Sequence, residues 1–227
     1  MAKLTKRVKA NQEIAEKYAG PQDLDTAIKA LKQFKGPKFD QSIEICAFLG
    51  IDPRQADQQL RGSVSFPHGI GKSSRVICFC QDDKIDDCKG AGAIEAGGET
   101  LVEKVSEGWF DFDVAIASPD MMRVVSKLGR VLGPKGVMPS PKAGTVTPDV
   151  VTAVKEFAAG KAQYRNDDYG NIHCVVGKMS FSEDNLRENL QHFLTLIDKI
   201  RPSAAKGDYI KKISISGTMT PGIQIAI

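Results

Sequence analysis

The 227-residue sequence has no long apolar run and almost no excess of charge of either sign. No stretch approaches the roughly 18–20 apolar residues that a membrane-spanning helix needs, so we expect no membrane partner. Aromatic residues make up only 7%, and 31 basic against 28 acidic residues leave a net charge of +3. Charge alone therefore does not indicate nucleic-acid binding. The 41% of hydrophobic residues suffices for a globular core and excludes the disordered and collagen-like classes.

Targeting signals and a paired set of cysteines are also lacking. The basic start, residues 1–7, is not followed by the apolar segment of a signal peptide, and Glu13 and Glu16 argue against a transit peptide. We therefore expect a cytoplasmic protein. An odd number of cysteines predicts reduced, partly buried thiols rather than a disulfide framework. These cysteines are Cys46, Cys78, Cys80, Cys88 and Cys174.

No catalytic group, cofactor or metal site is predicted. Cys78 and Cys80 lie two apart in a predicted strand, so their side chains face the same way. No second Cys or His pair completes a tetrahedral metal site, and the three histidines fall in different elements. No Ser-His-Asp or Cys-His grouping is indicated either. The residues alone therefore do not support a catalytic site.

One segment leaves an alternative open. Residues 69–73 read Gly-Ile-Gly-Lys-Ser, which resembles part of a phosphate-binding loop. If it were one, the protein would be an enzyme whose α/β insert binds a nucleotide or phosphate. That loop needs a glycine five residues before the Gly-Lys pair, where Phe66 stands here. It should also lead into a helix, whereas a strand pattern follows at Val76. A turn or hinge is the favoured interpretation.

Two Pro/Gly breaks, at residues 66–71 and 158–160, suggest how the chain is organised. Segments 1–67 and 160–227 together hold 20 basic and 15 acidic residues, whereas segment 68–159 holds 11 basic and 13 acidic ones. This difference favours a discontinuous domain, built from both ends of the chain, with residues 68–159 inserted as a second domain.

The hydrophobic periodicity of the two end segments predicts an α+β layer with antiparallel strands. Helices are predicted over 4–18, over 23–34, directly after Asp52-Pro53, and over 182–200. Strands are predicted over 39–50, 61–66, 209–216 and 223–227, with a hairpin of 162–166 and 172–176. Along the first strand, Ser42, Glu44, Cys46 and Phe48 share one face, and apolar side chains occupy the other.

The middle segment alternates strands and helices, which predicts a three-layer α/β domain. Its predicted strands are 76–80 and 114–117, and its predicted helices lie at 83–89, around 100–105, after Ser118-Pro119-Asp120, and over 148–157. The continuous apolar run at 114–117 is typical of a strand covered on both faces. The predicted fold class is therefore α/β, with two domains.

Two loops carry residue types suited to RNA. Residues 35–39, Lys-Gly-Pro-Lys-Phe, offer cations for phosphates and an aromatic ring for a sugar or base, and residues 216–222 offer small and hydroxyl side chains for a ribose edge. Arg165 and the basic, glycine-rich run 127–139 are further candidates. Each also has a plain interpretation as a loop, turn or surface ion pair, so a protein-interaction module without nucleic acid remains a third alternative.

Longer motifs are more specific. The chain resembles the uL1 family of large-subunit ribosomal proteins, in its bacterial form, over essentially its whole length. The motifs are LGIDPRQADQ at 49–58, Arg61-Gly62, FPHGIGK at 66–72, GWFDFD at 108–113, KLGRVLGPKG at 127–136, PKAGTV at 141–146, Arg165-Asn166-Asp167 and Thr218-Met219.

The resemblance implies a discontinuous, split β-α-β-like domain, residues 1–67 and 160–227, that binds RNA. The insert, residues 68–159, would be Rossmann-like. The implied function is that of a structural constituent of the large ribosomal subunit, which binds stalk helices of large-subunit ribosomal RNA. It would also take part in release of exit-site tRNA and repress translation of its own operon mRNA. Such a protein is a monomer when free, has no cofactor, and acts on the cytoplasmic ribosome.

The resemblance also implies an RNA-contacting set with one departure from the family pattern. Glycine usually follows the Thr-Met pair in this family, whereas Thr220 stands here. A β-branched residue could weaken or reshape a close backbone contact at this position. The implied set is Lys38, Phe39, Ser42, Glu44, Arg165, Asp167, Thr218, Met219 and Thr220.

Overall fold

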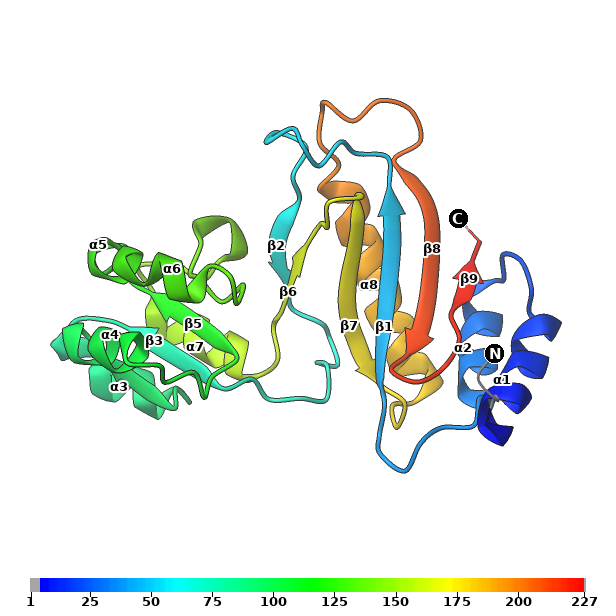
Figure 1. Ribbon diagram of the computed structural model, residues 1–227, viewed down its shortest axis with the longest axis horizontal. Helices are drawn as coiled ribbons and strands as arrows, with labels where there is room; N and C mark the ends of the chain where they lie inside the picture. Colours follow the sequence, from blue (N-terminus) through cyan, green and yellow to red (C-terminus); the bar gives the residue numbers. More distant parts are fainter. Residues whose placement is uncertain (1–4, 227) are drawn as a thin grey trace. The chain divides into compact units, whose positions relative to one another are not determined.

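The computed structural model describes residues 5–226, which form two compact units of mixed α/β structure. Unit 1 consists of residues 5–71 and 164–226, and unit 2 consists of residues 72–163. Unit 1 thus takes its elements from both ends of the chain, as the colours of Figure 1 show. Each boundary lies four residues beyond the position that the Pro/Gly breaks suggested. The predicted α/β fold class is confirmed.

Unit 1 is built on a four-stranded antiparallel sheet in the order β7-β1-β8-β9. The strands are β1 (Ser42–Leu49), β7 (Asn171–Lys178), β8 (Ile210–Gly217) and β9 (Ile223–Ile225). The central strand β1 comes from the N-terminal part of the chain, and the other three come from the C-terminal part. Neither part could form this sheet alone.

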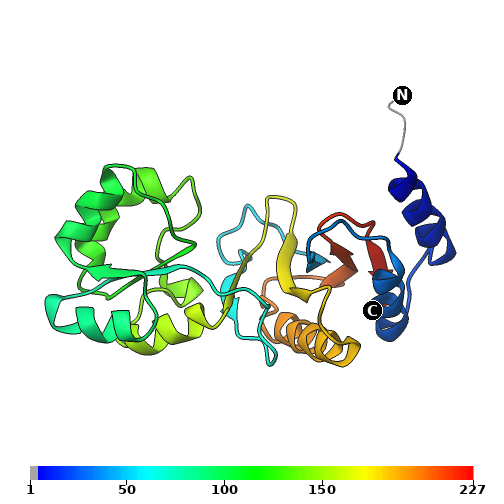
Figure 2. The ribbon, with the colours of Figure 1, turned by 90° about the horizontal axis from the view of Figure 1, so that it is seen from below.

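Helices of unit 1 cover one face of this sheet. α2 (Leu24–Gln33) and α8 (Glu183–Lys199) pack against its strands, and α1 (Lys6–Lys17) packs against α2. Figures 1 and 2 show α8 on one side of the strands only. The covered face of β1 carries Ile43, Ile45, Ala47 and Leu49, which are all buried. Between residues 5 and 226, no helix covers the opposite face, which carries the exposed side chains of Glu44 and Phe48.

Two predictions for unit 1 are wrong in part. β6 (Ala162–Arg165) pairs with β2 (Arg61–Val64), so the predicted hairpin with β7 is limited to its turn and a single bridge between Asn166 and Ile172. The predicted helix after Asp52-Pro53 is a series of turns. The Asp52 carboxylate accepts the N–H of Arg54, and this local bond competes with helical hydrogen bonding.

Unit 2 has a three-stranded parallel sheet in the order β4-β3-β5, with helices on both faces. Its strands are β3 (Val76–Phe79), β4 (Glu95–Gly97) and β5 (Val114–Ala117). One core lies under α3 (Ile85–Gly90) and α7 (Val150–Ala158). The other lies under α4 (Glu99–Ser106), α5 (Met122–Val125) and α6 (Gly129–Leu132). Three short 3-10 turns complete the unit: η1 (Asp82–Lys84), η2 (Ser126–Leu128) and η3 (Pro141–Ala143).

Two details of unit 2 differ from expectation. Strand β4 was not predicted, because three residues that include a glycine carry no periodic signal. The helix predicted after Ser118 is divided into α5, η2 and α6, which are only three or four residues long. None of the helices described is both long enough and apolar enough to span a membrane.

Candidate nucleic-acid interface

The loop before β1 and the turn after β8 are joined directly by hydrogen bonds. The N–H of Ser42 donates to Thr218 Oγ1 at 3.2 Å, and the N–H of Thr218 donates to the carbonyl oxygen of Ser42 at 3.0 Å. The N–H of Met219 donates to Gln41 Oε1 at 2.8 Å. Two candidate loops that are 176 residues apart in the sequence are therefore neighbours at one end of the sheet.

The loop after β7 completes this end of the sheet. Lys178 Nζ donates to Ser42 Oγ at 3.0 Å. The Asp40 carboxylate accepts both the N–H and the hydroxyl of Ser180, and the N–H of Met179 donates to the carbonyl oxygen of Gln41. Three segments thus form one hydrogen-bonded framework. The sequence analysis did not assign Lys178 or Ser180 to it.

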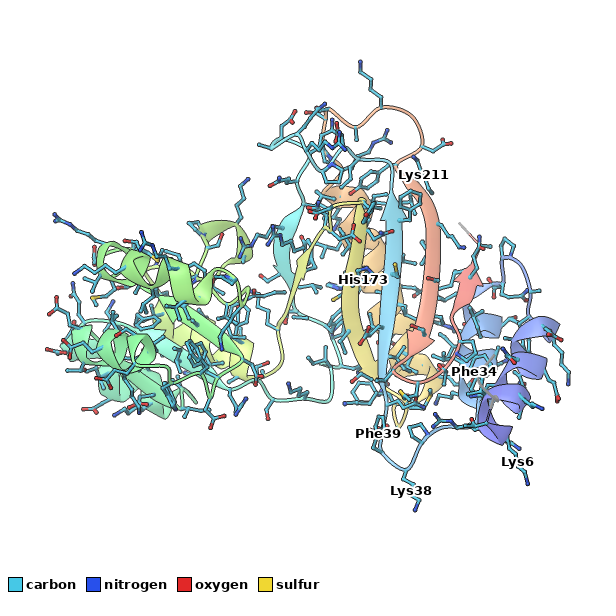
Figure 3. The ribbon with its side chains drawn as sticks, in the orientation of Figure 1. Lys6, Phe34, Lys38, Phe39, His173 and Lys211 are labelled. Atoms are coloured by element: carbon cyan, nitrogen blue, oxygen red, sulfur yellow. The ribbon has the colours of Figure 1, made fainter. Side chains whose placement is uncertain are left out.

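Two large apolar side chains project from this framework into solvent. Phe39 is 54% exposed and Met219 is 51% exposed. The neighbouring Lys38 is exposed too, and Figure 3 shows Lys38 and Phe39 beyond the lower end of β1. Exposed apolar groups beside a cation, held on a fixed backbone, are typical of a surface that binds a partner. We call this part of unit 1, residues 38–42 and 217–220, the loop edge.

The open face of the sheet continues from the loop edge. Glu44 follows Ser42 on this face, and in the next row Cys46 pairs with Ser214 on β8 and with His173 on β7. Figure 3 shows His173 on the uncovered side of the strands. The centre of the face therefore consists of small or polar side chains, which leave room for a partner to approach the strands.

An aromatic side chain and basic residues mark the far end of this face. Phe48 is exposed and pairs in register with Lys212 on β8 and Asn171 on β7. The ammonium of Lys211 lies 5.3 Å from the centroid of the Phe48 ring, which is a cation–π distance. Of these residues, only the position of Phe48 on the open face was read from the sequence.

Asp167 is held by several hydrogen bonds at this far end. Its carboxylate accepts the N–H and the side-chain amide of Asn171, at 2.7 and 2.8 Å, and the N–H of Tyr169 at 2.9 Å. Partial burial acts to raise the pKa of Asp167, but these hydrogen bonds and the nearby His173 outweigh it and lower that pKa below its usual value. Asp167 is therefore a fixed anion, with less need than a free carboxylate to reorganise on binding.

The charge of Asp167 also acts on the Cys46 thiol at the centre of the open face. Burial raises the pKa of this thiol most, the charge of Asp167 raises it further, and the charge of Lys212 lowers it. An acid from the β6–β7 connection and a base from β8 therefore both act on the centre of the face.

The structure divides the predicted RNA-contacting set into two groups. The loop edge holds Lys38, Phe39, Ser42, Thr218, Met219 and Thr220. Arg165 and Asp167 belong to the far end. Asp167 binds Asn171, and Asn171 pairs with Phe48 at that end of β1. Ser42, at the loop edge, pairs instead with Lys178. Ser42 and Phe48 are six positions apart on β1, which corresponds to about 20 Å along the strand. Glu44 lies on β1 between the groups.

Thr220, the departure from the family pattern, closes the turn after β8. The N–H of Gly217 donates to Thr220 Oγ1 at 2.9 Å, and the N–H of Thr220 donates to the carbonyl oxygen of Gly217 at 3.1 Å. No residue other than glycine has a positive φ in the part of the chain described. The turn therefore does not need a glycine at this position.

The glycine-rich segment 69–73 has the geometry of a turn attached to α8. Gly69 and Gly71 have φ values of 63° and 69°. The fully buried Asn189 accepts the N–H of His68 and donates to the carbonyl oxygen of Gly69. The segment precedes β3 and does not lead from a strand into a helix, which a phosphate-binding loop requires.

An open sheet face that joins two groups of charged and exposed apolar side chains is typical of a binding protein. The chain belongs to the family described as "Ribosomal protein L1p/L10e family", whose profile matches residues 30–221. It is 50% identical to "Large ribosomal subunit protein uL1" of Kosmotoga olearia over 202 residues, which cover 89% of this chain and 87% of that protein. It is 49% identical to the protein of the same name from Actinobacillus succinogenes over 228 aligned positions, which cover 99% and 98%.

These similarities confirm the family that the sequence motifs indicated. The chain is a ribosomal, RNA-binding protein of the cytoplasmic ribosome and is not an enzyme. The alternative of a nucleotide-binding enzyme based on residues 69–73 is therefore wrong.

Proposed function

We propose that the chain is a structural constituent of the large ribosomal subunit, and that unit 1 binds the stalk helices of large-subunit ribosomal RNA. The observation that carries this proposal is the hydrogen-bonded junction between Ser42 and Thr218, beside which Phe39 and Met219 are both exposed. A surface that is already ordered loses little conformational entropy when it binds.

Each group at the loop edge has a distinct role in this proposal. Lys38 neutralises phosphate charge, and Phe39 and Met219 pack on sugars and unpaired bases. The hydroxyl of Thr218 already bonds to both backbone groups of Ser42. Its first role is therefore to position the loop edge, and its remaining lone pair can accept a ribose 2′-hydroxyl.

The far end of the open face supplies a second contact in the same proposal. Arg165 is exposed and suited to a phosphate, and the fixed carboxylate of Asp167 can accept hydrogen bonds from a 2′-hydroxyl or a base amino group. Glu44, between the groups, repels phosphates that lie too close to the strands. Two contacts about 20 Å apart favour a folded RNA that spans the face over a short single strand.

Unit 2 supports a proposed contact with exit-site tRNA. Its basic run, residues 127–139, offers Lys127, Arg130 and Lys135, and Lys142 follows this run; all four are exposed. None of these four makes an ion pair with another residue in the part of the chain described. Exposed cations without a carboxylate partner attract phosphates, although the Lys135 ammonium also lies 3.5 Å from the centroid of the Phe110 ring. Through this contact, unit 2 would take part in tRNA release.

We further propose that the surface of unit 1 binds a similar structure in the protein's own operon mRNA and so represses its translation. A single surface cannot hold both RNAs at once. Ribosomal RNA should therefore displace the mRNA, which would relieve repression while ribosomes are being assembled.

Titration of the purified chain with a transcript of the large-subunit stalk tests the main proposal. Binding should be tighter than to an unrelated duplex of equal length. It should weaken with salt with a slope of about −0.7 to −0.9 per neutralised phosphate. Equal affinity for the two RNAs would refute specific recognition. The operon mRNA leader should compete with the stalk transcript, and independent binding of the two would contradict the shared surface.

A further inference from the structure

Three of the five cysteines meet in the core of unit 2. The Sγ atoms of Cys78, Cys80 and Cys88 all lie within 4.8 Å of one another, and those of Cys78 and Cys88 are 3.5 Å apart. All three residues are fully buried. Within residues 5–226, they form the one group of potential metal ligands that comes together in this way.

The fold explains why these thiols converge. Cys78 and Cys80 are two residues apart at the end of β3, so both side chains point to the face that α3 and α7 cover. Cys88 lies in α3 and points back at the same place. The sequence analysis considered only the pair on the strand, and therefore expected no metal site.

The number of ligands decides which ion fits. A metal–sulfur bond of about 2.3 Å places three sulfurs in a trigonal arrangement about 4 Å apart, close to the separations here. Zn²⁺ prefers four ligands, yet no imidazole nitrogen or carboxylate oxygen of the described residues joins this group. Three thiolates without a fourth ligand suit a soft ion such as Cu(I). We propose that Cys78, Cys80 and Cys88 form a three-thiolate binding site for a monovalent, thiophilic cation of the Cu(I) type.

A surface pocket lies next to the trio at the end of β3. Cys80 forms part of its wall, together with Asp82, Glu99 and Met121. Carboxylates attract a cation, and the thioether of methionine is a soft ligand that can bind Cu(I) transiently. The pocket therefore places groups that favour such an ion next to Cys80, while the three thiols themselves remain buried.

Binding requires the thiols to lose protons. Each sulfur that ligates the cation releases its proton to solvent, and no electron is transferred. Affinity should therefore rise with pH, by about tenfold per pH unit for each proton released.

The test is a titration of the reduced full-length chain with Cu(I), held by the chromophoric chelator bicinchoninate, without oxygen. The chain should withdraw one Cu(I) from the chelator and develop a thiolate-to-copper charge-transfer band. X-ray absorption at the copper edge should count three sulfur neighbours. If the chelator keeps the copper, if X-ray absorption finds no sulfur trio, or if the chain takes up Zn²⁺ but refuses Cu(I), the proposal is wrong.

Variants locate the site. Cys88→Ala should lower the affinity for Cu(I) by roughly tenfold or more, because one of three ligands is lost. Cys174→Ala, which removes a buried thiol from unit 1, should bind Cu(I) as the parent chain does. Unchanged binding after Cys88→Ala, or equal losses in both variants, would overturn the assignment. The emission of Trp109, the single tryptophan, checks that unit 2 of each variant remains folded. The count of sulfur neighbours by X-ray absorption is made on the unmodified chain, so it tests the proposal even if a variant fails to fold.

Discussion

The two main sheets of this protein differ in what covers them. The parallel sheet of unit 2 has a hydrophobic core on each face. The antiparallel sheet of unit 1 has helices on one face, while the other exposes Glu44, Phe48 and His173. The sequences of the central strands reflect this difference. β5 reads Val-Ala-Ile-Ala and is buried throughout, whereas β1 alternates buried apolar residues with more exposed ones.

This difference separates structural from functional residues. A side chain on a doubly covered sheet affects partners only through the stability of the unit. A side chain on an open face can be replaced with little effect on folding, so folding does not restrict which residue binds a partner there. The contrast therefore predicts which substitutions unfold the protein and which alter RNA binding alone.

The largest effect should come from the covered sheet. Phe79→Ala should destabilise unit 2 by about 3–5 kcal/mol, because it removes a fully buried ring from the core under α4. Denaturant unfolding followed by the emission of Trp109 measures this, since that residue lies in unit 2 and is the single tryptophan. Phe79→Leu, which keeps more of the volume, should cost below about 1.5 kcal/mol. Equal effects would mean that the core is loosely packed.

The second effect should come from the loop edge. Phe39→Ala should weaken binding to the stalk transcript by about 1–3 kcal/mol, because a base or sugar loses its apolar contact. Its effect on stability should be small, since the ring is 54% exposed. RNA titration and thermal unfolding of the same variant measure the two quantities.

Controls make this second test specific. Ile94 in unit 2 is 51% exposed, much as Phe39 is, so Ile94→Ala controls for the loss of an exposed apolar group. Thr218→Ala should weaken RNA binding by a similar amount, about 1–3 kcal/mol, because it removes the hydroxyl that bonds to Ser42. Full RNA affinity in both Phe39→Ala and Thr218→Ala would show that the loop edge is not the contact.

Local patterns in the sequence predicted much of the fold. The alternation from Ser42 to Phe48 identified the open face of β1. The helices predicted over 23–34 and 182–200 correspond to α2 and α8, whose N-caps are Asp23 and Ser182. The apolar run at 114–117 identified a strand covered on both faces. Each of these features depends on neighbours within a few residues, and such neighbours are visible in a single sequence.

Features that depend on distant residues could not be predicted in this way. The sequence named the loops around Phe39 and Thr218, but not the hydrogen bonds that join them. Nor did it reveal that Cys88 approaches Cys78, because that contact requires the packing of α3 on β3. The family motifs implied the roles of Arg165 and Asp167, but not their position at the far end of the open face.

A smaller effect should distinguish the two possible roles of Thr220. Thr220→Val keeps the β-branch but removes the hydroxyl that accepts the N–H of Gly217, so it should destabilise unit 1 by about 1 kcal/mol. Thr220→Ser keeps the hydroxyl and should remain close to the parent chain. Thermal unfolding compares the variants. If serine destabilises unit 1 as much as valine does, the shape of the side chain rather than its hydrogen bond sets the turn.

The smallest effect concerns pH at the far end of the open face. The pKa of Asp167 is lowered in the folded chain, so its ionised form stabilises unit 1 above the unfolded value of about 3.9. This contribution should disappear as the pH falls below that value and through the folded pKa. Asp167→Asn should therefore flatten the acid limb of the stability curve of unit 1, measured by circular dichroism between about pH 5 and 2.

Asp168→Asn is the matched control, because the Asp168 side chain takes no part in the bonds to Asn171 and Tyr169. An unchanged acid limb in Asp167→Asn would mean that the carboxylate is not held in solution, and the open face would then lose its fixed anion.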